Sequence, residues 1–202
     1  MQTNGVMVTG GATDQTEVQV RFEQLLQPIV GMAYGTAVRL TRSRTDAEDL
    51  VQDAALLAFK AFDSFEPDTN FKAWFFRILT NAFYSRHRKE KHDRANISTE
   101  DLPPLYLYTR TAEIGLHSQE PDPAAALMDR FDSEQVGAAL DALPTEYRTV
   151  ATLYFIEDFS YQQIADIVGC PVGTVRSRLH RGRRMLQKAL WQVAQERGIV
   201  PS

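Results

Sequence analysis

The sequence predicts an all-α protein made of two small helical domains that are joined by an acidic flexible linker. Apolar residues recur at helical spacing in two separate stretches, and no segment shows the alternation with period two that strands require. The segment between them holds four prolines and an excess of acids. We therefore expect a disordered N-terminal tail over residues 1–16, a first domain over 17–95, a linker over 96–130 and a second domain over 131–198.

Composition narrows the class of protein. The chain has 202 residues, of which 44% are hydrophobic and 24% charged, as in a soluble globular protein with buried cores. No apolar run is long enough to insert into a membrane, and no secretory signal is visible at the start, so we expect a cytoplasmic protein. The single Cys170 excludes an internal disulfide and a multi-cysteine zinc site. We expect no cofactor, no metal and no enzymatic activity.

The net charge of −4 conceals an ordered charge pattern. Residues 77–94 hold six bases against two acids, and residues 176–188 hold six bases and no acid. The intervening residues 96–146 hold ten acids and two bases. Two basic segments separated by an acidic one indicate an organised distribution of charge and not a uniformly solvated surface, so the negative net charge does not argue against binding of nucleic acid.

Several local signals place helices in the first domain. Pro28 interrupts a long apolar face, which predicts either a kinked helix or two helices with the second starting near Pro28. Thr45 to Glu48 has the pattern of a capping box, so the next helix is expected to begin there. Thr69 or Asn70 can cap the third long helix, which is expected to run from about Phe71 to about residue 91.

Residues 159–179 are typical of a helix-turn-helix. Ser160 can cap a short helix, Gly169 can supply the left-handed residue that ends it, and Pro171 prevents its continuation. Val175, Leu179, Gly182 and Leu186 then follow at helical steps, and the opposite face is basic. The residues near the start of this second helix are candidates for reading base edges, and the later ones for contacting phosphates. The base-reading candidates are Thr174, Arg176, Ser177 and His180, and the phosphate-binding candidates are Arg181, Arg183, Arg184 and Lys188.

The helix over residues 71–91 is unusually rich in aromatic residues. Trp74 and Phe75 are expected in the core, whereas the face with Arg77, Asn81, Tyr84, Ser85 and Arg88 suits single-stranded nucleic acid. The preceding helix has four acids in its first turns, at positions 46, 48, 49 and 53. These carboxylates either stabilise the helix dipole or meet a basic partner surface.

Three motifs in this order resemble the extracytoplasmic-function (group 4) bacterial sigma factors. They are Asp46–Asp53 (DAEDLVQD), Phe71–Asn81 (FKAWFFRILTN) and Gly173–Arg184 (GTVRSRLHRGRR). The last two look most like the thiol-oxidative-stress subgroup of actinobacteria. The resemblance implies a promoter-specificity subunit that binds core RNA polymerase, at the β′ clamp helices and the β flap, together with promoter DNA. It also implies an anti-sigma partner and a linker that threads the polymerase cleft.

The resemblance assigns site residues to three groups. The polymerase-binding segment would include Asp46, Glu48, Asp49, Gln52 and Asp53. The −10 element, melted to a single strand, would contact Thr69, Asn70, Phe71, Lys72, Arg77, Asn81, Tyr84 and Arg88. The duplex −35 element would be read by the second helix of the helix-turn-helix, with the residues named above. The first 16 residues and the apolar patch Leu105–Tyr108 match nothing in the family pattern.

Three other interpretations compete with this one. A conventional helix-turn-helix regulator would bind duplex DNA without polymerase, but it leaves the acidic helix and the aromatic basic helix unexplained. A metal or redox enzyme would use His87, His92 and Cys170, although the two histidines lie off one helical face among bases. A redox-sensing sigma factor would use Cys170, but one thiol cannot close an intramolecular disulfide.

Overall fold

The computed structural model describes residues 10–94 and 133–196, and all regular structure in these two ranges is helical. The predicted all-α class is therefore confirmed. The N-terminal unit comprises α1 (Gly10–Leu26), α2 (Val30–Thr41), α3 (Arg44–Lys60), the short 3₁₀ helix η1 (Phe62–Ser64) and α4 (Phe71–Arg94). The C-terminal unit comprises α6 (Ser133–Asp141), α7 (Thr145–Phe155), α8 (Tyr161–Val168) and α9 (Val172–Glu196). The expected linker and the Leu105–Tyr108 patch lie outside the described residues.

In the N-terminal unit, α3 packs against both α2 and α4, and α2 and α4 also contact each other. Leu50 of α3 and Phe75 and Leu79 of α4 are completely buried at this contact. At the start of α4, aromatic rings pack next to the loop that joins η1 to α4. Phe71 meets Phe65 edge-on, with ring centroids 5.3 Å apart, and Trp74 packs on both. This aromatic packing fixes the start of α4 and the loop before it.

The helix boundaries correct two of the sequence predictions. The first helix begins at Gly10, inside the tail that was predicted over residues 1–16. It ends before Pro28, and α2 is a separate helix. The first cap of α3 is Ser43, whose Oγ accepts the Asp46 N–H, so the Thr45 capping box was wrong by two residues. The prediction of a cap at Asn70 is confirmed, since its Oδ1 accepts the Ala73 N–H at 3.0 Å.

The C-terminal unit has the predicted helix-turn-helix in α8 and α9. Ser160 and Gln163 form a reciprocal capping box at the start of α8. Gly169 ends α8 with φ of 66°, the left-handed conformation that favours glycine. Ile164 of α8 and Val175 and Leu179 of α9 are buried between the two helices. The local signals in the sequence therefore fix this motif.

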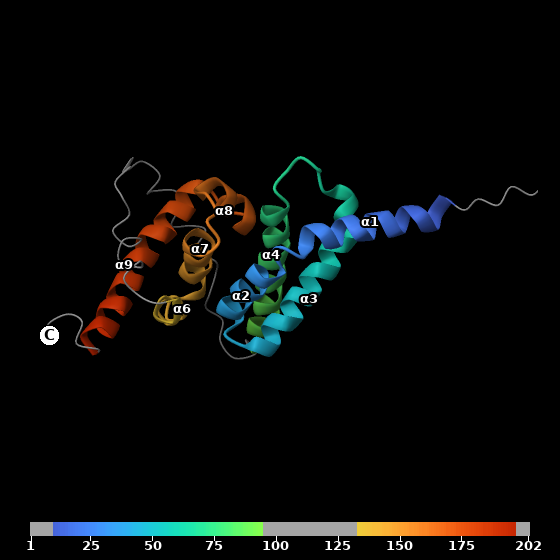
Figure 1. The fold of residues 1–202 in the computed structure, drawn as a ribbon. Helices are drawn as coiled ribbons and strands as arrows, with labels where there is room; N and C mark the ends of the chain where they lie inside the picture. The colour runs from blue at the N-terminus through green and yellow to red at the C-terminus, as the bar shows by residue number, and fades with distance from the viewer. Residues whose placement is uncertain (1–9, 95–132, 197–202) are drawn as a thin grey trace, which may run out of the picture.

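The two units share one hydrophobic core. α4 packs along α8, and α2 packs against α6 and α7, so the two groups of helices lie side by side in Figure 1. Phe76 of α4 and Phe159, just before α8, meet edge-on with ring centroids 5.3 Å apart. A second, smaller core between α6, α7 and α9 lies within the C-terminal unit and includes Leu140, Leu186 and Leu190. Within the described ranges, no helix combines the length and the apolarity needed to cross a bilayer.

Candidate nucleic-acid and polymerase surfaces

The acidic surface of α3 points to solvent. Its five predicted polymerase-binding residues are all exposed: Asp46, Glu48, Asp49, Gln52 and Asp53. Arg86 of α4 forms an ion pair with Asp53 and donates to the Asp49 carbonyl oxygen at 3.2 Å. Asp46 lies in the first helical turn, where a carboxylate favours the helix dipole. Most of this acidic charge is therefore available to a basic partner.

The basic face of α9 is also open. Arg176, His180, Arg184 and Lys188 follow one another at steps of four along the helix, and all four are exposed. Arg181 is exposed beside them. A helix with bases along one face and an open N-terminal half can enter a DNA major groove. These five residues satisfy the geometric requirement of the predicted −35 surface.

Three other predicted −35 residues contribute to packing in this conformation. Thr174 is only 8% exposed, and its carbonyl accepts the Ser177 hydroxyl at 3.0 Å. Arg183 donates to the Tyr161 hydroxyl at 3.1 Å, and its guanidinium lies over the Tyr154 ring at 5.3 Å. The Arg183 contacts hold α9 against α7 and α8, whereas the Ser177 hydrogen bond lies within α9. Periodicity alone did not separate such residues from the exposed ones, because they sit at the edge of the basic face.

The predicted −10 surface is divided. Thr69, Asn70, Arg77, Asn81 and Arg88 are exposed, in the loop before α4 and along one face of this helix. A polar, basic stripe of this kind can follow the backbone of a single strand. These five residues are therefore accessible in the conformation of the structure.

The other three predicted −10 residues are buried or partly covered. Phe71 is only 7% exposed and belongs to the aromatic packing of the N-terminal unit. Tyr84 lies against the C-terminal unit, where a hydrogen bond links it to the Thr149 side chain and burial raises the pKa of its hydroxyl. Lys72 is held by Glu157. No local pattern predicts this covering, because it arises from contacts between segments that are distant in the sequence.

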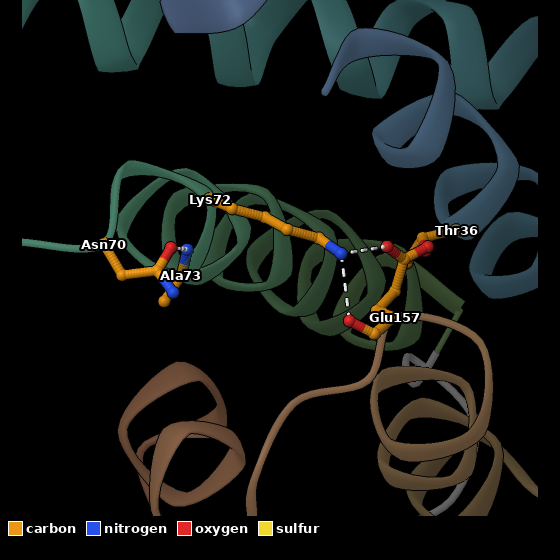
Figure 2. Close-up of polar contacts among 5 residues, drawn as sticks. All are labelled: Thr36, Asn70, Lys72, Ala73 and Glu157. Carbon is orange, nitrogen blue, oxygen red and sulfur yellow. Dashed lines mark hydrogen bonds and ion pairs between the residues drawn. The ribbon is translucent and has the colours of Figure 1, made fainter. Parts of the chain in front are cut away.

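Glu157 forms the main polar contact between the units (Figure 2). It stands between α7 and α8 and is only 4% exposed. Its Oε2 lies 3.0 Å from Lys72 Nζ, and its Oε1 accepts the Thr36 hydroxyl at 2.8 Å. Lys72 Nζ also donates to the Glu157 carbonyl oxygen at 2.9 Å. Sequence analysis missed this residue, and its one signal is that it belongs to an acidic pair, 157 and 158, that interrupts the apolar run over residues 153–159.

Two arginines form a second polar contact between the units. Arg148 of α7 is 3% exposed, and it donates to the Leu40 carbonyl at 3.1 Å and to the Leu143 carbonyl at 3.2 Å. Arg42, the left-handed residue after α2, donates in return to the carbonyls of Asp141 and Leu143. Burial and the neighbouring Arg42 lower the pKa of the Arg148 guanidinium. Each arginine thus donates hydrogen bonds to carbonyls near a helix C-terminus of the other unit. A positive charge is favourable there because the helix dipole is negative at its C-terminus.

Cys170 lies in the turn of the helix-turn-helix and is half-buried. Burial raises the pKa of its thiol, and the Arg178 guanidinium 4.0 Å away opposes that effect only in part. The protonated thiol is a poor nucleophile. This environment favours a structural role in the turn.

Both helical units match known protein families. Residues 25–93 match the family model for sigma-70 region 2, and residues 133–186 match the model for sigma-70 region 4. The chain is 34% identical over 179 residues to the ECF RNA polymerase sigma factor SigE of Mycolicibacterium smegmatis, covering 89% of this chain and 65% of that one. It is 38% identical over 155 residues to the ECF RNA polymerase sigma factor EcfG of Rhodopseudomonas palustris, covering 77% of both.

A solved structure agrees with these sequence matches. The sigma factor RpoE in complex with the anti-sigma factor NepR, from Bartonella quintana, has a TM-score of 0.61 and 32% identity, covering 84% of this chain and 96% of that one. The two matched helical regions define a sigma-70-type protein. More narrowly, the chain belongs to the ECF (extracytoplasmic-function) family of RNA polymerase sigma factors.

Proposed function

We propose that this protein binds core RNA polymerase and directs it to promoters by recognising a −10 and a −35 element. The observation that carries the proposal is that three chemically distinct surfaces are exposed on one chain: the acids of α3, the polar stripe of α4 and the basic face of α9. A polymerase subunit, a single DNA strand and a DNA duplex each require one of these chemistries. A conventional regulator would need only the last.

The three surfaces have separate tasks in this mechanism. Asp49, Gln52 and Asp53 dock α3 on the β′ clamp helices, while the C-terminal unit meets the β flap. Arg176 and His180 read bases of the −35 duplex, and Lys188 neutralises a phosphate. Extruding a base from the −10 duplex costs a few kcal/mol, and contacts along α4 offset that cost in the open complex. The protein has no chemistry of its own, so it is not an enzyme.

We further propose a cytoplasmic location, a stress-responsive regulon and control by an anti-sigma factor. The support for the last point is that the similar RpoE was solved with the anti-sigma factor NepR. The assignment to the thiol-oxidative-stress subgroup stays a prediction. The environment of Cys170 supports a signal that is sensed outside this chain, because its thiol is protonated and half-buried.

Run-off transcription with purified core polymerase tests the function. The template would carry a promoter identified from the transcripts that overexpression of the protein induces. We expect a discrete product only when the protein is added. Equal transcription by core polymerase alone would refute the proposal, and specific duplex binding without any effect on polymerase would favour the conventional regulator.

The α3 surface can be tested by measuring the affinity for core polymerase of two matched variants. Asp49→Asn removes one exposed carboxylate from the proposed docking surface and should weaken affinity for core polymerase several-fold. Glu17→Gln removes an exposed carboxylate from α1 and should leave this affinity unchanged. Equal affinities for the two variants would remove α3 from the polymerase interface.

A further inference from the structure

The Lys72 ammonium group is surrounded by groups from the C-terminal unit. Besides the two oxygens of Glu157, it lies over the Phe159 ring at 4.9 Å and over the Phe76 ring at 5.6 Å. A carboxylate and an aromatic face together satisfy this ammonium group, whose side chain stays 25% exposed. A nucleic-acid strand offers a lysine the same two chemistries, a phosphate anion and the face of a base.

Three residues spaced along α4 contact the C-terminal unit. Lys72 and Phe76 are one turn apart on one side of the helix, and Tyr84 follows two turns later, displaced around the helix axis by about 80° toward Arg77. All three contact the C-terminal unit, through Glu157, Phe159 and Thr149 respectively. The neighbouring face with the exposed Arg77 and Asn81 is open. The C-terminal unit therefore covers one side of the surface on which the −10 strand is proposed to bind.

We propose that Glu157 and Phe159 act as an internal substitute for the promoter strand, so that the free protein is autoinhibited in this closed form. Glu157 forms an ion pair with Lys72 in place of a phosphate, and Phe159 packs on the Phe76 ring in place of a base. Strand binding at this face requires the C-terminal unit to move away from α4. This inference rests on the proposed function, since it assigns α4 to the −10 strand.

The closed form leaves the first steps of promoter recognition possible. The α3 acids and the α9 face from Arg176 to Lys188 remain exposed. Polymerase can therefore engage the closed protein, and only the single-strand surface must wait for opening. The Arg42 and Arg148 contacts at the other end of the interface stabilise the same closed arrangement.

The test compares Glu157→Gln with Asp158→Asn in the full-length free protein. Both changes remove one negative charge from the same loop, but Asp158 is exposed, and its left-handed φ of 57° also suits asparagine. The probe is a fluorescein-labelled single-stranded oligonucleotide with the non-template −10 sequence of an induced promoter, and binding is measured by fluorescence anisotropy. Apparent affinity scales with the open fraction, so we expect Glu157→Gln to bind about tenfold more tightly than wild type. Asp158→Asn should bind like wild type.

Two further measurements test whether the closed form opens and cover the case in which Glu157→Gln does not fold. Small-angle X-ray scattering should show a larger radius of gyration for Glu157→Gln than for wild type. Arg42→Ala, at an exposed position, should tighten oligonucleotide binding in the same direction, and it decides the matter if Glu157→Gln fails to fold.

If folded Glu157→Gln or, in its place, Arg42→Ala binds the oligonucleotide no better than wild type, the autoinhibition proposal is wrong. Run-off transcription at saturating core polymerase should be unchanged by Glu157→Gln, because promoter-bound holoenzyme is already open. Loss of run-off transcription with the wild-type protein would instead refute the proposed function. The two proposals therefore fail in different assays.

Discussion

Replacing Arg148 by alanine tests the contact between the two units most directly. The side chain is 3% exposed and donates to the carbonyls of Leu40, Asp141 and Leu143 at 3.1–3.3 Å. Arg42 also donates to Asp141 and Leu143, so these two carbonyls keep a donor in the variant. Leu40, in the last turn of α2, loses its charged donor altogether.

The expected magnitude follows from these contacts. A hydrogen bond from a charged donor contributes about 1.5–3 kcal/mol, and a buried carbonyl left without a partner costs about 1–3 kcal/mol. Because the carbonyls are partly covered by Arg42, we expect Arg148→Ala to lower the free energy of unfolding by about 3–4 kcal/mol. Arg148→Lys should recover only part of this loss. The planar guanidinium group donates to two helix ends at once, whereas the compact ammonium group of lysine cannot reach both.

Urea unfolding followed by circular dichroism measures the effect, with the slope of the transition checked against wild type. Arg44→Ala is the matched control, because it removes an exposed arginine two residues from Arg42 and should change stability by less than about 0.5 kcal/mol. If Arg148→Ala costs less than about 1 kcal/mol, the contacts of Arg148 do not stabilise the interface, and the reasoning is refuted.

Three other predictions concern the helix-turn-helix. Gly169→Ala forces a β-carbon into φ of 66° and should cost about 1–2 kcal/mol of unfolding free energy, whereas no loss in a urea titration would contradict the need for glycine. Because burial raises the pKa of Cys170 more than Arg178 lowers it, iodoacetamide at pH 8 should alkylate the folded protein more slowly than the urea-unfolded chain; equal rates would show that the thiol is not protected. In anisotropy titrations with holoenzyme, Arg176→Ala should lose discrimination between −35 sequences. Lys188→Ala should lower the affinity for all sequences alike and reduce the salt dependence of binding by about one charge. Identical behaviour of both variants would argue against the division into base and phosphate contacts.

The helix-turn-helix was predictable because its determinants are local. Each determinant acts within a few residues: the Ser160 cap, the left-handed Gly169 and the apolar steps from Val175 to Leu186. The packing of the rest of the protein does not alter them. The exposure of the α3 acids and of Arg176, Arg184 and Lys188 was predictable for the same reason, since the opposite side of each helix is apolar.

The start of α3 shows where local signals become ambiguous. Ser43 and Thr45 both carry hydroxyls that can cap a helix, and the capping-box pattern favoured Thr45. The structure selects Ser43 because Arg42 ends α2 in the left-handed conformation with φ of 59° and turns the chain at once into α3. The side chain of Arg42 then reaches the Leu143 carbonyl of the other unit. The choice of cap is therefore tied to a contact that is 101 residues away in sequence.

The sequence by itself determined the helices, the helix-turn-helix and the three charged or polar faces, because side-chain spacing and capping are short-range properties. Only the tertiary structure decided that the units pack together and that Lys72 and Tyr84 are covered. Glu157 meets Lys72 across 85 residues and Thr36 across 121, and nothing in the spacing of a chain with 26 acids and 22 bases selects those partners. Their pairing follows from the shared apolar core around Phe76 and Phe159, which brings α4 and α8 together and leaves a buried carboxylate that a cation must neutralise.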